Sequence, residues 1–264
     1  MRFRAIADSA TRQGARAEPV DRVKEPALRG VDGRRDEHPA PASANLVMQG
    51  VTKHWRQGLR RQTAPVLNDV DFELAPGEAV WVGGRNGVGK TTLLRLIAGV
   101  IIPDAGTVRL QGLDPERDRR RYQSRIGYLS AGNTGLIARL PGRYQLKYWS
   151  YMAFVPASER EAAIDRAITA FDLHELAKQR VDRMSMGQRQ RIRCAMVFLH
   201  SPEVVLLDEP LTSLDDEGAA LLSKAVREVT GRGGSVVSCS PGDDLDRLHF
   251  DRRCAIEGDR LVAA

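Results

Sequence analysis

The sequence predicts an α/β fold in which a mainly parallel sheet is covered by helices on both faces. The first observation is a set of short, continuous apolar runs at residues 79–82, 204–207 and, more weakly, 236–237. Such runs are typical of strands that are buried on both faces of a sheet. The second observation is that helical patterns lie between these runs, an alternation typical of α/β domains. The third is that no internal repeat is visible, so we expect one such domain.

From Leu46 onward the elements can be assigned in order. Val70, Phe72 and Leu74 alternate with polar residues, which predicts a half-buried strand. Residues 92–98 follow a glycine-rich loop and are predicted to form a helix that ends at Gly99. Two later segments carry apolar residues that recur on one helical face. These residues are Ile164, Ala167, Ile168 and Phe171 in the first segment, and Leu221, Leu222, Ala225, Val226 and Val229 in the second.

The first 44 residues differ from the rest of the chain. Arginines and acidic residues are mixed there, prolines punctuate them, and apolar residues are few and without period. Such a segment cannot bury enough surface to offset its ordering entropy. We therefore predict a disordered extension over 1–44 and a folded domain over 45–264. The extension lacks the features of a secretory signal or a transit peptide, and an incorrectly assigned start site is the alternative explanation.

Composition excludes several classes of protein. The chain of 264 residues is 42% hydrophobic and 28% charged, as in an ordinary globular protein. Its longest apolar stretch, 93–102, is interrupted by Arg95 and falls short of the roughly 18 residues of a membrane span, so a membrane role is expected to be peripheral. The three cysteines are scattered, which disfavours disulfides and cysteine-bound zinc and favours a reducing cytoplasm.

The net charge of +6 is not informative by itself. Its one notable cluster is a basic run at 117–121, in which four arginines surround Asp118. The simpler interpretation is a solvated helix face, and contact with phosphates or anionic lipid head groups is the alternative.

A glycine-rich loop follows the apolar run at 79–82. Residues 84–91 match the pattern G-x-x-x-x-G-K-[ST] in full, between a predicted strand and a predicted helix. Glycines let backbone N–H groups approach phosphate oxygens, and the N-terminus of the helix favours negative charge. We predict that Lys90 reaches the β- and γ-phosphates of a nucleoside triphosphate and that the Thr91 hydroxyl binds Mg²⁺. The residues predicted to bind nucleotide here are Gly84, Arg85, Asn86, Gly87, Val88, Gly89, Lys90, Thr91 and Thr92.

Two carboxylates directly follow the apolar run at 204–207. Asp208 and Glu209 stand at its carboxyl end, which is where ligands bind in open α/β sheets. Asp208 suits Mg²⁺, directly or through water, and Glu209 is placed to polarise an attacking water. An apolar strand that ends in acids is common, but together with the phosphate loop it predicts a catalytic site in which Glu209 and Lys90 act.

Several stretches resemble the ATP-binding cassette (ABC) ATPases. Residues 184–191, Met-Ser-Met-Gly-Gln-Arg-Gln-Arg, are similar to the L-S-G-G-Q signature of that family. Residues 208–215 resemble its Walker B motif and D-loop, 67–78 its strand pair before the phosphate loop, and 106–112 its hairpin. The resemblance extends over residues 46–264. It implies a P-loop NTPase core with a mainly parallel sheet, an antiparallel β subdomain and a helical signature subdomain.

The resemblance also implies how the site is completed. Two such domains would pack head to tail, with each ATP between one phosphate loop and the partner's signature. The signature residues are Ser185, Met186, Gly187 and Gln188, and the D-loop residues are Ser213, Leu214 and Asp215. Trp55 stands where the family places an aromatic residue that stacks on adenine, and a tryptophan without a ligand is the alternative.

Two positions depart from the family pattern. Ala131 stands where the family has a glutamine that touches Mg²⁺ and links the site to the membrane partner, and Asn133 is a weaker candidate for that role. Pro241 stands where the family has a switch histidine, while His249 is expected to be an ordinary residue of the next helix. The resemblance therefore predicts nucleotide binding with weak basal hydrolysis.

The leading interpretation is the ATP-binding and ATP-hydrolysing subunit of an ABC exporter, with ATP and Mg²⁺ as cofactors. Met186 and residues 140–146, Leu-Pro-Gly-Arg-Tyr-Gln-Leu, resemble exporters of polysaccharides and related envelope molecules. The implied partners are a separate transmembrane permease, docked on residues 133–183, and a second ABC subunit, identical or different. The implied location is the cytoplasm, peripheral on the inner face of the cell membrane.

The sequence leaves two other interpretations open. One is an ABC switch that dimerises on ATP with little or no hydrolysis. The other is a soluble ABC protein that acts on DNA or ribosomes. A long coiled-coil insertion or a second cassette would support the latter, and neither is visible, so no nucleic-acid partner is expected. The transported substrate is not encoded in this chain.

Overall fold

A computed structural model describes residues 45–264 except 58–59, 62–63, 133 and 242–246. The extension predicted at 1–44 lies outside the described residues and stays a prediction. The strands of the described part are β1 (Leu46–Lys53), β2 (Arg56–Gln57), β3 (Arg60–Arg61), β4 (Leu67–Leu74), β5 (Ala79–Gly83), β6 (Ala105–Leu110), β7 (Ile126–Leu129), β8 (Val204–Asp208), β9 (Ser235–Cys239), β10 (Arg252–Glu257) and β11 (Arg260–Ala263). The helices are α1 (Lys90–Ile97), α2 (Arg119–Gln123), α3 (Gly142–Met152), α4 (Arg160–Ala170), α5 (Met186–Phe198) and α6 (Asp216–Gly231), with a 3₁₀ turn at Val181–Arg183.

The central sheet has the strand order β11-β10-β5-β9-β8-β7. All neighbouring strands in it are parallel except β10 and β11, which confirms the predicted mainly parallel sheet. Alternate residues of β8 enter different cores. Val204 and Leu206 pack with α1, whereas Val205 and Leu207 pack with the later helices. Both faces of the strand are therefore covered, which is why its sequence is continuously apolar.

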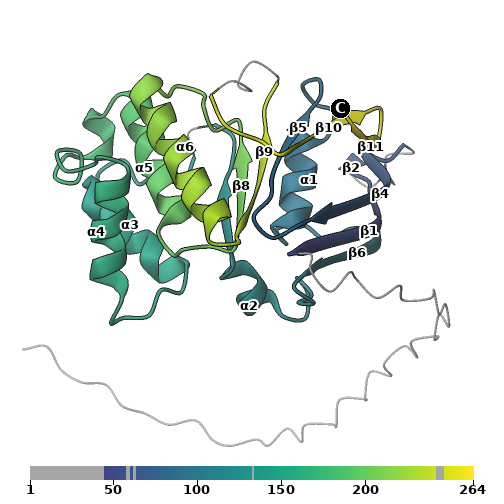
Figure 1. The fold of residues 1–264 in the computed structure, drawn as a ribbon, viewed down its shortest axis with the longest axis horizontal. Coiled ribbons are helices and arrows are strands. Elements are labelled where there is room, and N and C mark those ends of the chain that lie inside the picture. The colour runs from purple at the N-terminus through teal and green to yellow at the C-terminus, as the bar shows by residue number, and fades with distance from the viewer. Residues whose placement is uncertain (1–44, 58–59, 62–63, 133, 242–246) are drawn as a thin grey trace, which may run out of the picture. The chain divides into compact units, whose positions relative to one another are not determined.

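A second, antiparallel sheet has the order β4-β1-β6. Its buried residues, such as Leu46 and Phe72, share one core with Leu94 of α1 and Val80 of the central sheet. Helices α3, α4, α5 and α6 lie together beyond the other face of the central sheet (Figure 1). The antiparallel β subdomain and the helical subdomain expected from the resemblance are thus both present.

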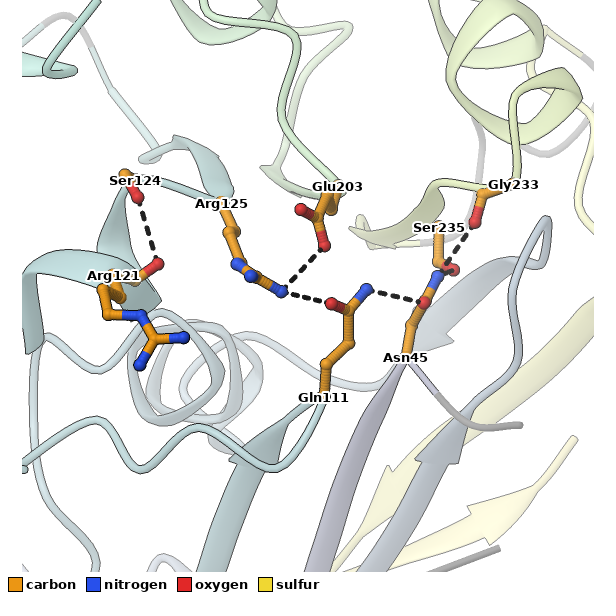
Figure 2. Close-up of polar contacts among 8 residues, drawn as sticks. All are labelled: Asn45, Gln111, Arg121, Ser124, Arg125, Glu203, Gly233 and Ser235. Atoms are coloured by element: carbon orange, nitrogen blue, oxygen red, sulfur yellow. Dashed lines mark hydrogen bonds and ion pairs between the residues drawn. The ribbon is translucent and has the colours of Figure 1, made fainter. Parts of the chain in front are cut away.

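A chain of hydrogen bonds ties the two sheets together at the ends of strands opposite to the phosphate loop. Arg125 contacts Glu203 and Gln111, and the Gln111 amide donates to Asn45 Oδ1 at 3.2 Å (Figure 2). Asn45 Nδ2 then donates to the Ser235 hydroxyl at 2.7 Å. These residues lie at the ends of β1, β6, β7, β8 and β9. The hydrogen bonds between them therefore fix the antiparallel sheet against the central sheet.

Several boundaries differ from the sequence-based prediction. The helix expected at 92–98 begins at Lys90 and ends at Ile97, because the loop closes directly onto its first turn. The basic run lies in part on α2, where Arg119, Arg120 and Arg121 are exposed, which fits both interpretations of the run. Within the described ranges, no helix is long and apolar enough to cross a membrane.

Candidate functional site

The glycine-rich loop adopts a conformation that only glycine accommodates easily. Gly84 and Gly89 have φ angles of 136° and 122°, outside the range that side chains favour. A Cβ at Gly84 would lie 3.0 Å from the carbonyl oxygen of Ile256, and one at Gly89 would lie 3.1 Å from that of Val66. The loop therefore packs tightly between β5 and α1, with Arg85, Asn86 and Gly87 exposed at its tip.

The Lys90 side chain lies inside this loop and is only 6% exposed. Its Nζ donates to the carbonyl oxygens of Gly84 at 2.6 Å and Arg85 at 3.1 Å. These bonds hold a positive charge under the arch of the loop, at the N-terminus of α1. An anion in the arch would meet both the ammonium group and the positive end of the helix.

Asp208 lies at the carboxyl end of β8 and is 2% exposed. Burial raises the pKa of its carboxyl group, while the Thr91 side chain, the Ala131 backbone and the charges of Arg95 and Lys90 lower it. Its Oδ2 is buried without a hydrogen-bond partner among the described residues. A buried carboxylate oxygen with no donor, next to a threonine hydroxyl, is the type of oxygen ligand that Mg²⁺ prefers. Asp208 and Thr91 therefore fit the predicted metal site.

Glu209 follows in a conformation that is rare for residues other than glycine, with φ 50°. Its backbone N–H donates to the carbonyl oxygen of Cys239 at 2.8 Å, which fastens it to the end of β9. The turn redirects the chain at the sheet edge and places Glu209 in the wall of the cleft that holds the loop residues. Local strain of this kind is often found at functional sites.

A cleft of about 380 Å³ brings these groups together. Trp55, 38% exposed, forms part of its wall, although it precedes the loop by about thirty residues in the chain. The other residues that line the cleft are Val66, Asn86, Gly87, Gly89, Lys90, Thr91, Thr92 and Glu209. A flat aromatic ring therefore lies at the same cleft as the phosphate loop, an arrangement suited to a base and its phosphates.

The predicted signature lies elsewhere, at the start of α5. Ser185 is the N-cap residue, and its hydroxyl accepts a hydrogen bond from the Gln188 N–H at 3.2 Å. The Gln188 side chain accepts in return from the Ser185 N–H at 3.0 Å, which completes a capping box. Met186 is 55% exposed at the first helical position. The signature is thus a capped helix N-terminus outside the cleft of its own chain.

The D-loop packs against the signature. Ser213 has φ 69°, and Leu214 is buried. The Asp215 side chain caps α6 by accepting a hydrogen bond from the Gly218 N–H at 2.8 Å. Gly187 lies directly against the Ser213 carbonyl oxygen, so the signature and the D-loop are neighbours in this chain.

The two departures from the family pattern lie at the edge of the site. The pairing of Leu129 with Leu207 places the residues after β7 beside Asp208, and Ala131 is among them. Pro241 is exposed just after β9, while Asn133 and Gly242 lie outside the described residues. The prediction for His249 was wrong. This residue lies in the loop before β10, where its Nε2 is 3.7 Å from Asp251 Oδ1 and its side chain is 78% exposed.

Sequence reasoning missed two polar residues near the site, Gln190 and Arg193. Both are buried on α5, and each is 5% exposed. A signal was present in the sequence, because Arg193 stands three residues before the buried Met196 and so shares its helical face. A charged residue that shares a helical face with a buried apolar residue indicates a specific partner inside the protein.

The chain is similar to several known proteins. A family model described as "ABC transporter" matches residues 67–212. The phosphonates import ATP-binding protein PhnC 2 of Rhodopseudomonas palustris (strain BisB18) is 31% identical over 236 residues, covering 82% of this chain and 82% of that protein. The daunorubicin resistance ATP-binding protein DrrA3 of Streptomyces coeruleorubidus is 33% identical over 198 residues, covering 75% of this chain and 62% of that protein. A solved dimeric ATP-binding cassette, in a post-hydrolysis state with ADP and Pi, has a TM-score of 0.72 at 21% identity, covering 82% of this chain and 96% of that chain.

Proposed function

The chain belongs to the ABC transporter family as an ATP-binding subunit, and from this premise we propose that it binds and hydrolyses ATP to energise a separate membrane permease. The observation that carries the proposal is the cleft at which Trp55, the phosphate loop and Glu209 meet. The orphaned carboxylate oxygen of Asp208 supports a metal ion beside it.

Each residue of the cleft has a role that follows from its chemistry. Trp55 stacks on the adenine base, and the loop N–H groups and Lys90 bind the phosphates. Thr91 and Asp208 would hold Mg²⁺, which neutralises charge on the phosphate oxygens. Glu209 orients and polarises the attacking water at the mouth of the loop.

The site is completed by a second subunit, either a copy of this chain or a different one. The capped N-terminus of α5 presents the signature residues, and a helix N-terminus suits contact with the partner's γ-phosphate. These residues are Ser185, Met186, Gly187 and Gln188. The family dimerises and works with transmembrane permeases. We assign permease docking to residues 133–183, where Tyr144, Tyr148 and Tyr151 of α3 are each about half exposed. We also propose that the subunit lies on the cytoplasmic face of the membrane.

For the direction of transport we propose export of polysaccharide or a related envelope molecule. The support is the resemblance of residues 140–146 and of the signature to such exporters, together with the relative named for daunorubicin resistance. The relative named for phosphonate import is the competing indication. Co-purification with the membrane subunit, followed by identification of that subunit, decides between the two directions.

A second candidate function is an ATP-dependent dimerisation switch that hydrolyses slowly. The specific observation in its favour is that Ala131 and Pro241 carry no side-chain donor at two positions beside the site. In this case ATP binding and dimerisation persist while turnover is weak.

One experiment tests the main proposal. The purified chain is titrated with a fluorescent ATP analogue in Mg²⁺ and in EDTA, and phosphate release is measured alongside for the wild type and for Glu209→Gln. Saturable binding with turnover that falls in Glu209→Gln supports an ATPase. Binding without turnover supports the switch, and absence of binding in both conditions overturns both.

A further inference from the structure

Arg193 carries a buried positive charge for which the described residues provide only uncharged acceptors. It lies on α5 and is 5% exposed. Its Nη2 donates to the carbonyl oxygen of Ser130 at 2.5 Å, and its Nε donates to that of Thr134 at 3.0 Å. Its Nη1 donates to the side-chain oxygen of Gln190 at 2.6 Å. Burial lowers its pKa, because a charged guanidinium group is unfavourable inside the protein. The hydrogen bonds to Ser130, Thr134 and Gln190 offset this penalty.

The two backbone oxygens belong to the segment that leaves β7 beside the metal-site carboxylate. Because Leu129 pairs with Leu207, Ser130 follows at the level of Asp208. The backbone of Ala131 is close enough to Asp208 to lower the pKa of its carboxyl group. In this chain the segment thus meets the metal site through its backbone, since the Ala131 side chain has no polar atom.

The packing under this segment is incomplete. A hollow of about 70 Å³ lies beneath it, lined in part by Ser130, Thr134, Trp149 and Arg193. The Trp149 Nε1 and Tyr128 Oη atoms are buried without a hydrogen-bond partner among the described residues. Beside this hollow, the guanidinium group of Arg193 supplies hydrogen bonds to the segment.

The same side of α5 also holds the chain that leaves β8. The Gln190 Nε2 donates to the carbonyl oxygen of Pro210 at 2.9 Å, in a buried contact. Pro210 directly follows Glu209. Gln190 and Arg193 lie one helical turn apart and are hydrogen-bonded to each other. Together they hold the segment after β7 and the segment after β8, which lie beside the Asp208–Glu209 pair.

We propose that Arg193, with Gln190, is a positioning residue for the nucleotide site, fixing the exits of β7 and β8 so that the Asp208 carboxylate faces the metal ion. The inference rests on the proposed function, because it needs an ATP site with a metal at Asp208. This chain has Ala131 where the family has a glutamine at the metal site. The inference assigns the positioning of this segment to a buried arginine on α5.

The test is the Mg²⁺ dependence of nucleotide binding in Arg193→Met. The affinity for a fluorescent ATP analogue is measured in EDTA and across a Mg²⁺ titration, with circular dichroism to verify folding. Because the loop and Trp55 are untouched, the affinity in EDTA is expected to stay within about twofold of wild type. The half-saturating Mg²⁺ concentration is expected to rise about tenfold, as for other residues that position metal ligands.

Arg191→Met is the matched control. Arg191 lies on the same helix, and its side chain is 12% exposed, but its ion-pair partners are Glu217 and Asp172. It should lose stability without a change in Mg²⁺ dependence. If Arg193→Met does not fold, Gln190→Met is measured in the same way and should shift the Mg²⁺ dependence in the same direction.

The outcomes separate the inference from the function on which it rests. Equal loss of affinity in EDTA and in Mg²⁺ would mean a general structural role and overturn the inference. A wild-type Mg²⁺ dependence in Arg193→Lys would also overturn it, because a single ammonium nitrogen cannot occupy the three positions from which Nε, Nη1 and Nη2 reach these oxygens. A wild type that binds no nucleotide in either condition would instead overturn the proposed function.

Discussion

Gly187 of the signature lies directly against the carbonyl oxygen of Ser213 in the D-loop, so closely that a Cβ at Gly187 would be 2.7 Å from that oxygen. Such a distance is shorter than side-chain carbons tolerate, and the obstacle is backbone that cannot rotate away. The contact explains why a glycine is needed here in a helix, where glycine is otherwise unfavourable. It also joins the signature, which is proposed to face a partner subunit, to the D-loop.

We predict that Gly187→Ala destabilises the protein by about 1–3 kcal/mol, the usual cost of inserting a methyl group into a packed site. The matched control is Gly231→Ala, at the end of α6, where an added Cβ meets nothing within 4 Å. That substitution should instead stabilise by about 0.5–1 kcal/mol. Urea denaturation of both variants measures the difference, and equal midpoints would contradict the importance of the contact.

We predict that Lys90→Ala weakens MgATP binding by about 10- to 100-fold, since a charged hydrogen bond to phosphate is typically worth about 1.5–3 kcal/mol. The substitution also removes the bonds to Gly84 and Arg85 that hold the arch. Equilibrium titration with a fluorescent ATP analogue measures the effect. Lys224→Ala, exposed on α6, is the control and should bind as the wild type does. Unchanged affinity in Lys90→Ala would refute the assignment of the loop.

Trp55 provides a direct optical test of the base site. If it stacks on adenine, its fluorescence changes on ATP addition, and Trp55→Ala loses affinity by about 1–3 kcal/mol, as for stacking in nucleic-acid binders. Trp81 and Trp149 contribute background emission, so Trp55→Phe, which keeps a ring but lacks the indole, is the control. A fluorescence response in Trp55→Ala identical to that of the wild type would exclude the role.

The parts of the site that could be predicted from sequence are those whose chemistry is local. The loop at 84–91 carries its glycines, lysine and threonine in one continuous stretch between a strand and a helix, so their joint position follows from the chain itself. The positions of Asp208 and Glu209 were also predictable, because ligands bind at the carboxyl ends of the strands in such a sheet and these acids follow a predicted strand. Their conformations were not, since φ 50° at Glu209 depends on its bond to Cys239.

The parts that could not be predicted depend on contacts between distant segments. Arg193 and Ser130 are 63 residues apart in the sequence, and no local sequence pattern predicts that they are in contact. The nearness of Trp55 to the loop likewise depends on how the antiparallel sheet packs on α1. The expectation for His249 failed because no capping or periodic pattern supported a helix there, and the chain instead runs directly into β10.

The last prediction concerns Pro241, at the end of β9. The resemblance places a histidine here that bonds the γ-phosphate and holds the attacking water together with the glutamate, whereas proline has neither a side-chain donor nor a backbone N–H. Loss of one transition-state donor typically costs on the order of 10²–10³ in rate. Because Lys90, Thr91, Asp208 and Glu209 remain, we expect tight ATP binding and ATP-driven dimerisation with weak basal hydrolysis.

Pro241→His should therefore hydrolyse ATP faster than the wild type, measured as steady-state phosphate release at saturating MgATP. Pro241→Ala is the control, because it restores the backbone N–H without the imidazole and should gain less. The change is sterically plausible because Pro241 is exposed. Wild-type turnover at ordinary enzyme rates of about 1–10 per second, with no gain in Pro241→His, would contradict the prediction. Brisk hydrolysis only after addition of a second cassette that carries the histidine would assign catalysis to that partner, and this chain would then be one half of a heterodimer.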